Sequence, residues 1–257
     1  MKSNFEYGTI NNMKKPTRKN YIESDVLLAH KDPGISSFDV IRKMRPLLGT
    51  RKIGHAGTLD PLASGLMILG VNSGTKKLTN YLKLPKTYIA EILIGKSTTT
   101  GDLEGEVVEE AIVDRKDMKK RVIQGVVEGM LGSHTLQVPL YSAIKVQGKA
   151  LYAYARAGET PPYIPEKEMN ITSIYMTDSY RSGGYHVIKV RVDVTSGTYI
   201  RTLGEELGRR LGYPATLKKL YRVSIGEYFD QDAYRFPVKK QRKHWFRAII
   251  ELLFGKK

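Results

Sequence analysis

One carboxylate stands out as a candidate for chemistry: Asp60, in the stretch from Gly54 to Gly65 that reads GHAGTLDPLASG. Pro61 fixes its own φ angle and pushes Asp60 towards extended geometry, while the glycines let the backbone pass close to a partner. A carboxylate presented in this way can act as a nucleophile or stabilise a developing positive charge. For a lone Asp-Pro pair the alternative is an ordinary turn aspartate between two strands.

A cation and an aromatic ring are the next candidates. Arg201 lies in the stretch GTYIRTL, at the start of an expected helix, where the helix dipole disfavours a positive charge. An anionic partner would explain that position, although a surface ion pair is the alternative. Tyr88 lies on an alternating strand, Lys86 to Glu91, where a tyrosine is ordinarily a core residue.

The elements that must position these residues can be read from apolar periodicity and from turn signals. After a strand at 26–29 and a turn at 31–34, Ser36 or Ser37 caps a helix that Gly49 stops. We expect this helix to turn five apolar side chains inward: Phe38, Ile41, Met44, Leu47 and Leu48. Further along the chain we expect a buried strand at 66–71, helices at 75–83, 114–130 and 200–211, and a hairpin that turns at 181–184.

Composition narrows the class of protein. The chain has 257 residues, with 42 lysines and arginines against 26 aspartates and glutamates, a formal charge of +16. This charge favours a polyanionic partner, although it would also suit a ribosomal or membrane-surface protein. There is no cysteine, and the five histidines show no metal-ligand spacing, so we expect no metal site. No apolar run reaches the length of a membrane span and no signal peptide opens the chain, so we expect a cytoplasmic protein.

The stretch around Asp60 closely resembles the catalytic loop of the bacterial tRNA pseudouridine-55 synthases, the TruB family, which reads G-H-x-G-T-L-D-P-x-A-x-G. Three further stretches, in the same order, resemble this family's motifs: KTY at 86–88, GTYIRTL at 197–203 and LKKLYRVSIGEYF at 217–229. The resemblance covers residues 25 to 233 and implies the pseudouridine synthase fold. That fold is α+β, with a mixed, mostly antiparallel central sheet flanked by helices and loops.

Domain boundaries follow from the resemblance and from the basic ends of the chain. We expect a flexible basic tail at 1–23, a catalytic domain at 24–235 and a basic amphipathic tail at 236–257, with no full C-terminal RNA-binding domain. Residues 238–257, VKKQRKHWFRAIIELLFGKK, hold seven lysines and arginines and a single acid, Glu251. A docked helix, a basic arm and a membrane-surface helix are the three alternatives for this segment. We predict a docked helix whose basic side extends the tRNA-binding surface.

By resemblance, the site residues take defined roles. Asp60 is the catalytic residue, Arg201 pairs with it, and Tyr199 belongs to the same pocket. Tyr88 stacks on the target base and Leu220 packs against its other side.

The resemblance also implies contacts to RNA. His55 is the residue that fills the space left by the flipped uridine, although a loop histidine bonded to backbone is the alternative. Lys31, Gly57 and Thr58 are expected to contact RNA near the site. The expected partner is the T-arm of tRNA, bound by a monomer without a guide RNA.

The implied reaction breaks the N1–C1′ bond of uridine 55, turns the base and rejoins it through C5. Atoms are conserved and no redox step occurs, so no cofactor is expected. The target uridine must first be extruded from the T-loop. Attack at C1′ and attack at C6 both stay open, and either Tyr88 or a water can accept the C5 proton. Two other functions are alternatives: a guide-RNA-dependent synthase and a non-catalytic tRNA-binding or folding protein on the same scaffold.

Overall fold

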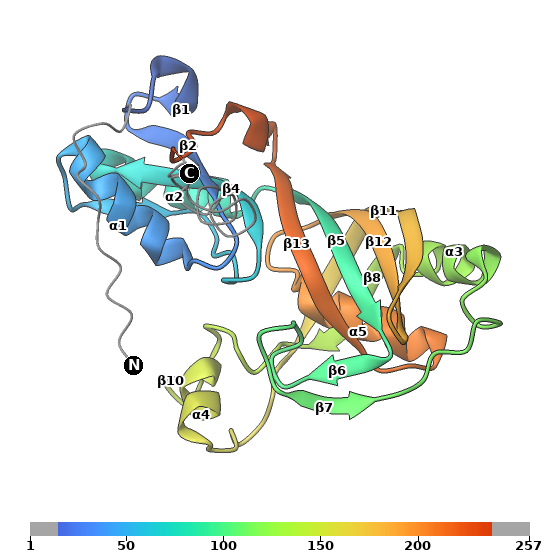
Figure 1. Ribbon diagram of the computed structural model, residues 1–257. Helices are drawn as coiled ribbons and strands as arrows, with labels where there is room; N and C mark the ends of the chain where they lie inside the picture. The colour runs from blue at the N-terminus through green and yellow to red at the C-terminus, as the bar shows by residue number, and fades with distance from the viewer. Residues whose placement is uncertain (1–14, 238–257) are drawn as a thin grey trace, which may run out of the picture.

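A computed structural model describes residues 15–237 of the chain. One large mixed sheet runs through the molecule in the order β1-β2-β4-β13-β5-β12-β11-β8, with β3 paired to β4 and β14 to β13 (Figure 1). Every pairing in it is antiparallel except that between β4 and β13. The α+β class and the mostly antiparallel sheet expected from the sequence are confirmed.

The strands of this sheet are β1 (Tyr21–Glu23), β2 (Val26–Lys31), β3 (Ile53–His55), β4 (Ser64–Val71), β5 (Lys86–Ile94), β8 (Gly132–Gln137), β11 (Glu166–Ser182), β12 (Tyr185–Val194), β13 (Ala215–Ile225) and β14 (Tyr228–Phe229). Two small two-stranded sheets are formed by β6 (Lys96–Thr98) with β7 (Val107–Glu110) and by β9 (Lys145–Val146) with β10 (Lys149–Ala150). The helices are α1 (Ser37–Leu48), α2 (Leu78–Leu82), α3 (Lys120–Glu128), α4 (Leu151–Ala157) and α5 (Ile200–Leu211).

Local signals explain α1 and α5. The Ser36 side chain accepts a hydrogen bond from the backbone N–H of Asp39, whose own side chain accepts one from the backbone of Ser36, and Gly49 ends the helix at φ +66°. Gly212 ends α5 in the same left-handed conformation. These bounds, and the hairpin between β11 and β12, agree with the sequence prediction.

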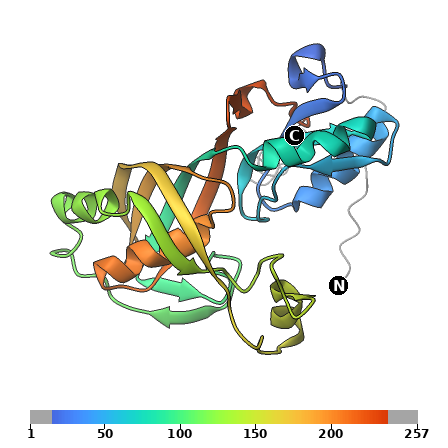
Figure 2. The ribbon, with the colours of Figure 1, turned by 180° about the vertical axis from the view of Figure 1, so that it is seen from behind.

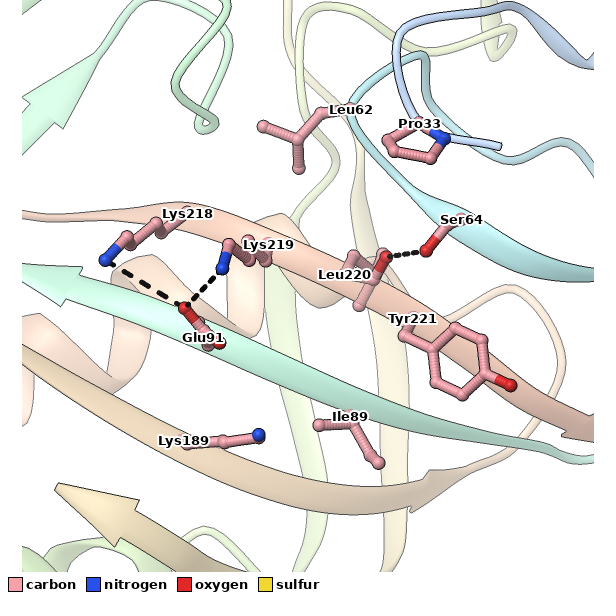
Figure 3. Close-up of a pocket in the computed structure, with 10 residues that line it drawn as sticks. All are labelled: Pro33, Leu62, Ser64, Ile89, Glu91, Lys189, Lys218, Lys219, Leu220 and Tyr221. Carbon is pink, nitrogen blue, oxygen red and sulfur yellow. Dashed lines mark hydrogen bonds and ion pairs between the residues drawn. The ribbon is translucent and has the colours of Figure 1, made fainter. Parts of the chain in front are cut away.

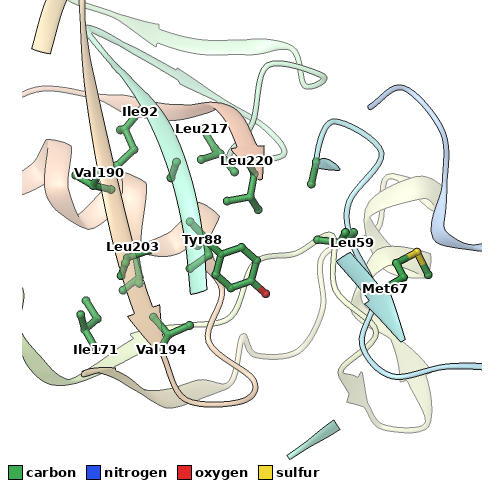
Figure 4. Packing of buried hydrophobic residues seen from close by; sticks show 14 of the residues in the cluster. Leu59, Met67, Tyr88, Ile92, Ile171, Val190, Val194, Leu203, Leu217 and Leu220 are labelled. Atoms are coloured by element: carbon green, nitrogen blue, oxygen red, sulfur yellow. The ribbon is translucent and has the colours of Figure 1, made fainter. Parts of the chain in front are cut away.

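One part of the main buried cluster lies between the sheet and α5, and the same cluster continues to α1 and α3. Alternate residues of β5 and β12 point towards this helix, among them Ala90, Ile92 and Val190, and they meet Leu203 and Leu207. Figure 4 shows this packing, and Figure 2 shows α5 from behind. In Figure 1, β13 and β5 lie in front of α5, so that their other face is turned away from the helix.

Four expectations about elements need correction. The helix expected from Asp114 begins only at Lys120, because the Asp114 side chain accepts a hydrogen bond from the backbone of Lys116 and forms a local turn instead. The helix expected at 75–83 is a 3₁₀ helix at Asn72–Lys77 followed by the short α2. Phe38 is 52% exposed rather than buried, with the Arg45 guanidinium over its ring.

The fourth correction concerns the N-terminal tail. Strand β1 lies inside the range that was expected to be flexible. Its pairing with β2 makes it part of the main sheet. The preceding Asn20 is also buried, and its amide donates to the carbonyl of Asp232. The prediction for residues 238–257 lies outside the described residues. Within the described residues, no helix is long and apolar enough to cross a membrane.

Candidate active site

Asp60 lies on the loop between β3 and β4, where that loop faces the N-terminus of α5. The Arg201 Nε atom is 2.9 Å from Asp60 Oδ2, and its Nη2 atom donates to Oδ1 at 3.3 Å. The guanidinium therefore holds the carboxylate with both prongs, a geometry that fixes orientation as well as charge. The Arg201 side chain is only 5% exposed while that of Asp60 is 32% exposed, so the carboxylate is the end of the pair that a substrate can reach.

The same guanidinium is fixed from behind by backbone oxygens. Its Nη1 atom donates to the carbonyl of Thr100 at 2.8 Å, and Nη2 donates to the carbonyl of Tyr141 at 3.0 Å. Arg201 thereby joins α5 to two loops. Its guanidinium forms an ion pair with Asp60. This pair supplies the anion that a cation at a helix start was expected to need.

Opposing effects set the pKa of Asp60. Burial raises the pKa of this carboxyl above its ordinary value, and the neighbouring Asp102 adds to that rise. Arg201 and Lys31 oppose the shift. The outcome is a pKa above the ordinary aspartate value, a perturbation of the kind found at functional sites.

Two buried cations hold the loop that carries Asp60. The Lys31 ammonium group donates to the carbonyls of Pro61 and Ala63, and Arg222 donates through Nε to the carbonyl of Leu66 and through Nη2 to that of Gly57. Both side chains are almost wholly buried, and burial lowers the pKa of Lys31 to about 8. The backbone on both sides of Asp60 is thus anchored to β2 and β13.

A serine supplies a third anchor. The Ser37 hydroxyl donates to the carbonyl of Leu59 and accepts from its backbone N–H, both at 2.9 Å. The first turn of α1 therefore fixes the residue that precedes Asp60. These contacts make the loop a rigid support for the carboxylate.

Tyr88 and Leu220 lie close to this loop. They come from the adjacent strands β5 and β13 and belong to the same buried cluster as Leu59, towards which the Tyr88 ring points (Figure 4). Tyr199 is the residue before α5, and it packs against a second cluster around Leu151. Stacking of a base on Tyr88 and Leu220 stays a prediction.

The residues expected to contact RNA differ in their exposure. Thr58 is exposed, and Gly57 adopts φ +95° where the loop turns above Arg222. His55 ends β3; its Nδ1 atom is buried without a hydrogen-bond partner, and burial lowers its pKa, so the ring is neutral at neutral pH. Lys31 is fully buried, and its ammonium group is engaged with carbonyls of its own chain. The structure gives Lys31 a positioning role, and direct contact of this residue with RNA stays a prediction.

Comparison with known proteins decides the family. Residues 45–200 match the model of the TruB family pseudouridylate synthase, N-terminal domain. The chain belongs to the TruB family. It is 41% identical over 210 residues to tRNA pseudouridine synthase B of Leifsonia xyli, a match that covers 80% of this chain and 68% of that protein. The protein of the same name from Bacillus subtilis is 40% identical over 212 residues, with 82% of this chain and 68% of that protein covered.

Solved structures give the same fold at lower similarity. An H/ACA ribonucleoprotein bound to a substrate RNA containing 2′-deoxyuridine matches with a TM-score of 0.57 and 21% identity, over 82% of this chain and 50% of that chain. A Cbf5–Nop10–Gar1 complex matches with a TM-score of 0.58 and 21% identity, over 96% of this chain and 64% of that chain. These likenesses support the pseudouridine synthase fold of this TruB family member.

Arg222 and Ser37 are positioning residues whose roles were not predicted from the sequence. Arg222 stands two positions after Leu220 on a strand, and this spacing places both side chains on the same face of the sheet. An arginine at an inward position of a strand is a signal that could have been used. Ser37 was considered only as an alternative cap for α1.

Proposed function

We propose that this TruB family chain converts uridine 55 in the T-loop of tRNA into pseudouridine. The observation that carries the proposal is the two-pronged contact between Arg201 and Asp60, on a loop that two buried cations hold in place. The relatives from Leifsonia xyli and Bacillus subtilis are named as tRNA pseudouridine synthases, which supports tRNA as the substrate.

In this proposal, each residue has a separate task. Asp60 attacks the nucleotide, or stabilises positive character at C1′, when the N1–C1′ bond breaks. Arg201 keeps the carboxylate ionised and aimed inside a site where burial alone would favour its neutral form. The detached base turns while it is held between Tyr88 and Leu220, and C5 then bonds to C1′. The proton that leaves C5 goes to Tyr88 or to a water.

Access to the nucleotide requires base flipping, since uridine 55 is stacked in the folded T-loop. Extrusion costs a few kcal/mol, which contacts to the flipped base and to the flanking phosphates must offset. His55 is the residue proposed to occupy the vacated space, and its neutral ring suits a position among stacked bases.

One assay tests the proposal against its alternatives. The purified chain is incubated with an unmodified tRNA transcript, with no guide RNA, and pseudouridine is mapped along the product. We expect modification at position 55. A product that forms only when a guide RNA is added would indicate a guide-dependent enzyme, and tight tRNA binding with no product would indicate a binding or folding protein.

A further inference from the structure

A groove of about 500 Å³ opens beside the catalytic loop (Figure 3). Its floor consists of side chains on the sheet face turned away from α5, because Ile89 and Glu91 alternate along β5 with residues that point towards the helix. Its other lining residues come from the loops before α1 and β4 and from strands β4, β12 and β13: Pro33, Leu62, Ser64, Lys189, Lys218, Lys219, Leu220 and Tyr221.

The groove is positively charged. Three lysines line it, Lys189, Lys218 and Lys219, against a single acid, Glu91. The Nζ atoms of Lys218 and Lys219 lie 4.0 and 3.6 Å from Glu91 Oε2, and the Lys219 side chain is 68% exposed. One carboxylate cannot neutralise three ammonium groups, so positive charge remains available to a ligand along an otherwise apolar surface.

The groove is continuous with the catalytic loop. Leu62 is two residues from Asp60, and the Ser64 hydroxyl donates to the carbonyl of Leu220 at 3.4 Å. Leu220 lines the groove and also belongs to the buried cluster of Tyr88. The groove therefore borders the loop that carries Asp60, while Asp60 itself is not among its lining residues.

We propose that the groove binds the stretch of substrate RNA that flanks the target nucleotide. The lysines take consecutive phosphates, and a base lies on the apolar strip formed by Ile89 and the Tyr221 ring, since such surfaces accept any base by stacking. This inference rests on the proposed function and adds the path of the RNA outside the catalytic pocket.

RNA fits this surface better than a protein strand does. The floor is made by β12, β5 and β13, neighbouring strands whose backbone groups are paired within the sheet, so that no free strand edge is offered. A row of cations beside stacking surfaces is the combination that single-stranded nucleic acid uses.

The first test compares two variants that lose the same charge. One carries Lys189→Gln, Lys218→Gln and Lys219→Gln in the groove; the other carries Lys116→Gln, Lys119→Gln and Lys120→Gln, at exposed positions before and at the start of α3. The affinity of each for unmodified tRNA is measured as a function of salt concentration. Removing three phosphate-binding lysines should make the slope of log K against log salt shallower by about 2, since each neutralised phosphate in a single strand contributes about 0.7.

The control variant should keep a slope close to that of the parent protein. Thermal unfolding is measured for both variants to check that they are folded. Equal slopes for the two variants, or a groove variant that binds as the parent does, would overturn the proposal.

The second test locates the RNA. Because the chain has no cysteine, Lys219→Cys provides a unique thiol that can carry a short photo-crosslinker. We expect crosslinks to nucleotides next to the target uridine, and none there from the control Lys120→Cys. If crosslinks form only to distant parts of the tRNA while the parent protein still forms pseudouridine, the proposal for the groove is contradicted and the proposed function is not. If the parent protein forms no pseudouridine, the proposed function fails instead.

Discussion

At the scale of single residues, the site depends on one carboxylate that is partly buried and paired. Burial favours the neutral acid of Asp60, and the two-pronged contact with Arg201 favours the anion. A substrate reaches the carboxylate because Arg201 is the more deeply buried partner. The reactivity of Asp60 therefore depends on the geometry of Arg201 as well as on its charge.

Replacing Arg201 with lysine tests this geometry. Arg201→Lys keeps the positive charge but loses the fork that meets both oxygens of Asp60 and the carbonyls of Thr100 and Tyr141. We expect turnover to fall about a hundredfold, because a misplaced catalytic group costs that order of rate. Affinity for tRNA should change little. Loss of affinity with turnover preserved would show that Arg201 contacts phosphate instead.

The pH dependence of catalysis tests the balance of effects on Asp60. The ionised form is active and its folded pKa is raised, so the single-turnover rate should fall as pH decreases through a value above the ordinary aspartate pKa of 3.8. In Arg201→Gln the opposing cation is absent, and this acid limb should move to higher pH. An acid limb that stays at the same pH in Arg201→Gln would mean that another group controls it.

At the scale of elements, the parallel contact between β4 and β13 places the catalytic loop beside Leu220 and Arg222. Gly65, at the start of β4, is opposite Arg222 in this register. It has φ +112°, and a Cβ atom there would lie 2.7 Å from the backbone nitrogen of Arg222 and closer still to its carbonyl oxygen. Two backbones approach so closely here that only glycine fits.

Gly65→Ala should therefore destabilise the protein far more than Gly212→Ala, measured by denaturant unfolding. Gly212 also has a positive φ, +80°, but a Cβ atom on this residue would have no neighbouring atom within 4 Å. The Gly212 variant should lose only about 1–2 kcal/mol, the cost of a left-handed side-chain-bearing residue. Equal losses for the two variants would mean that the close approach at Arg222 is relieved by movement.

Elements whose ends are set by nearby residues could be predicted from the sequence, whereas contacts between residues far apart in the sequence could not. The bounds of α1 and α5 follow from a capping serine and from glycines that end each helix, and these signals act within a few residues. The helix predicted from Asp114 was wrong because the same residue type caps a turn equally well. The burial of Lys31 and Arg222 depends on carbonyls of a loop far away in the sequence, which periodicity does not reveal.

At the scale of the whole molecule, the question is which surfaces carry the excess positive charge of +16. The groove accounts for three cations, and the sequence of residues 238–257, outside the described range, contains seven more. Both would add to the electrostatic attraction for tRNA, which falls with salt concentration.

Deleting residues 238–257 should weaken tRNA binding and make the salt slope shallower by several units, at about 0.9 for each phosphate that is no longer neutralised. Turnover at saturating tRNA should barely change, because none of the residues assigned to the catalytic step lies in the deleted segment. Combining the deletion with the groove variant should give additive changes in slope if the two surfaces bind separate phosphates. An unchanged slope after the deletion would assign these cations to another role.

The most direct test of the central claim is single-turnover pseudouridine formation by Asp60→Asn on unmodified tRNA. An amide fits the space of the carboxylate and can still accept a hydrogen bond from Arg201, but it can neither attack the nucleotide nor stabilise a cation. We predict a folded protein that binds tRNA as the parent does and forms no pseudouridine at position 55. Measurable product from a pure Asp60→Asn preparation would contradict the assignment of Asp60 as the catalytic residue.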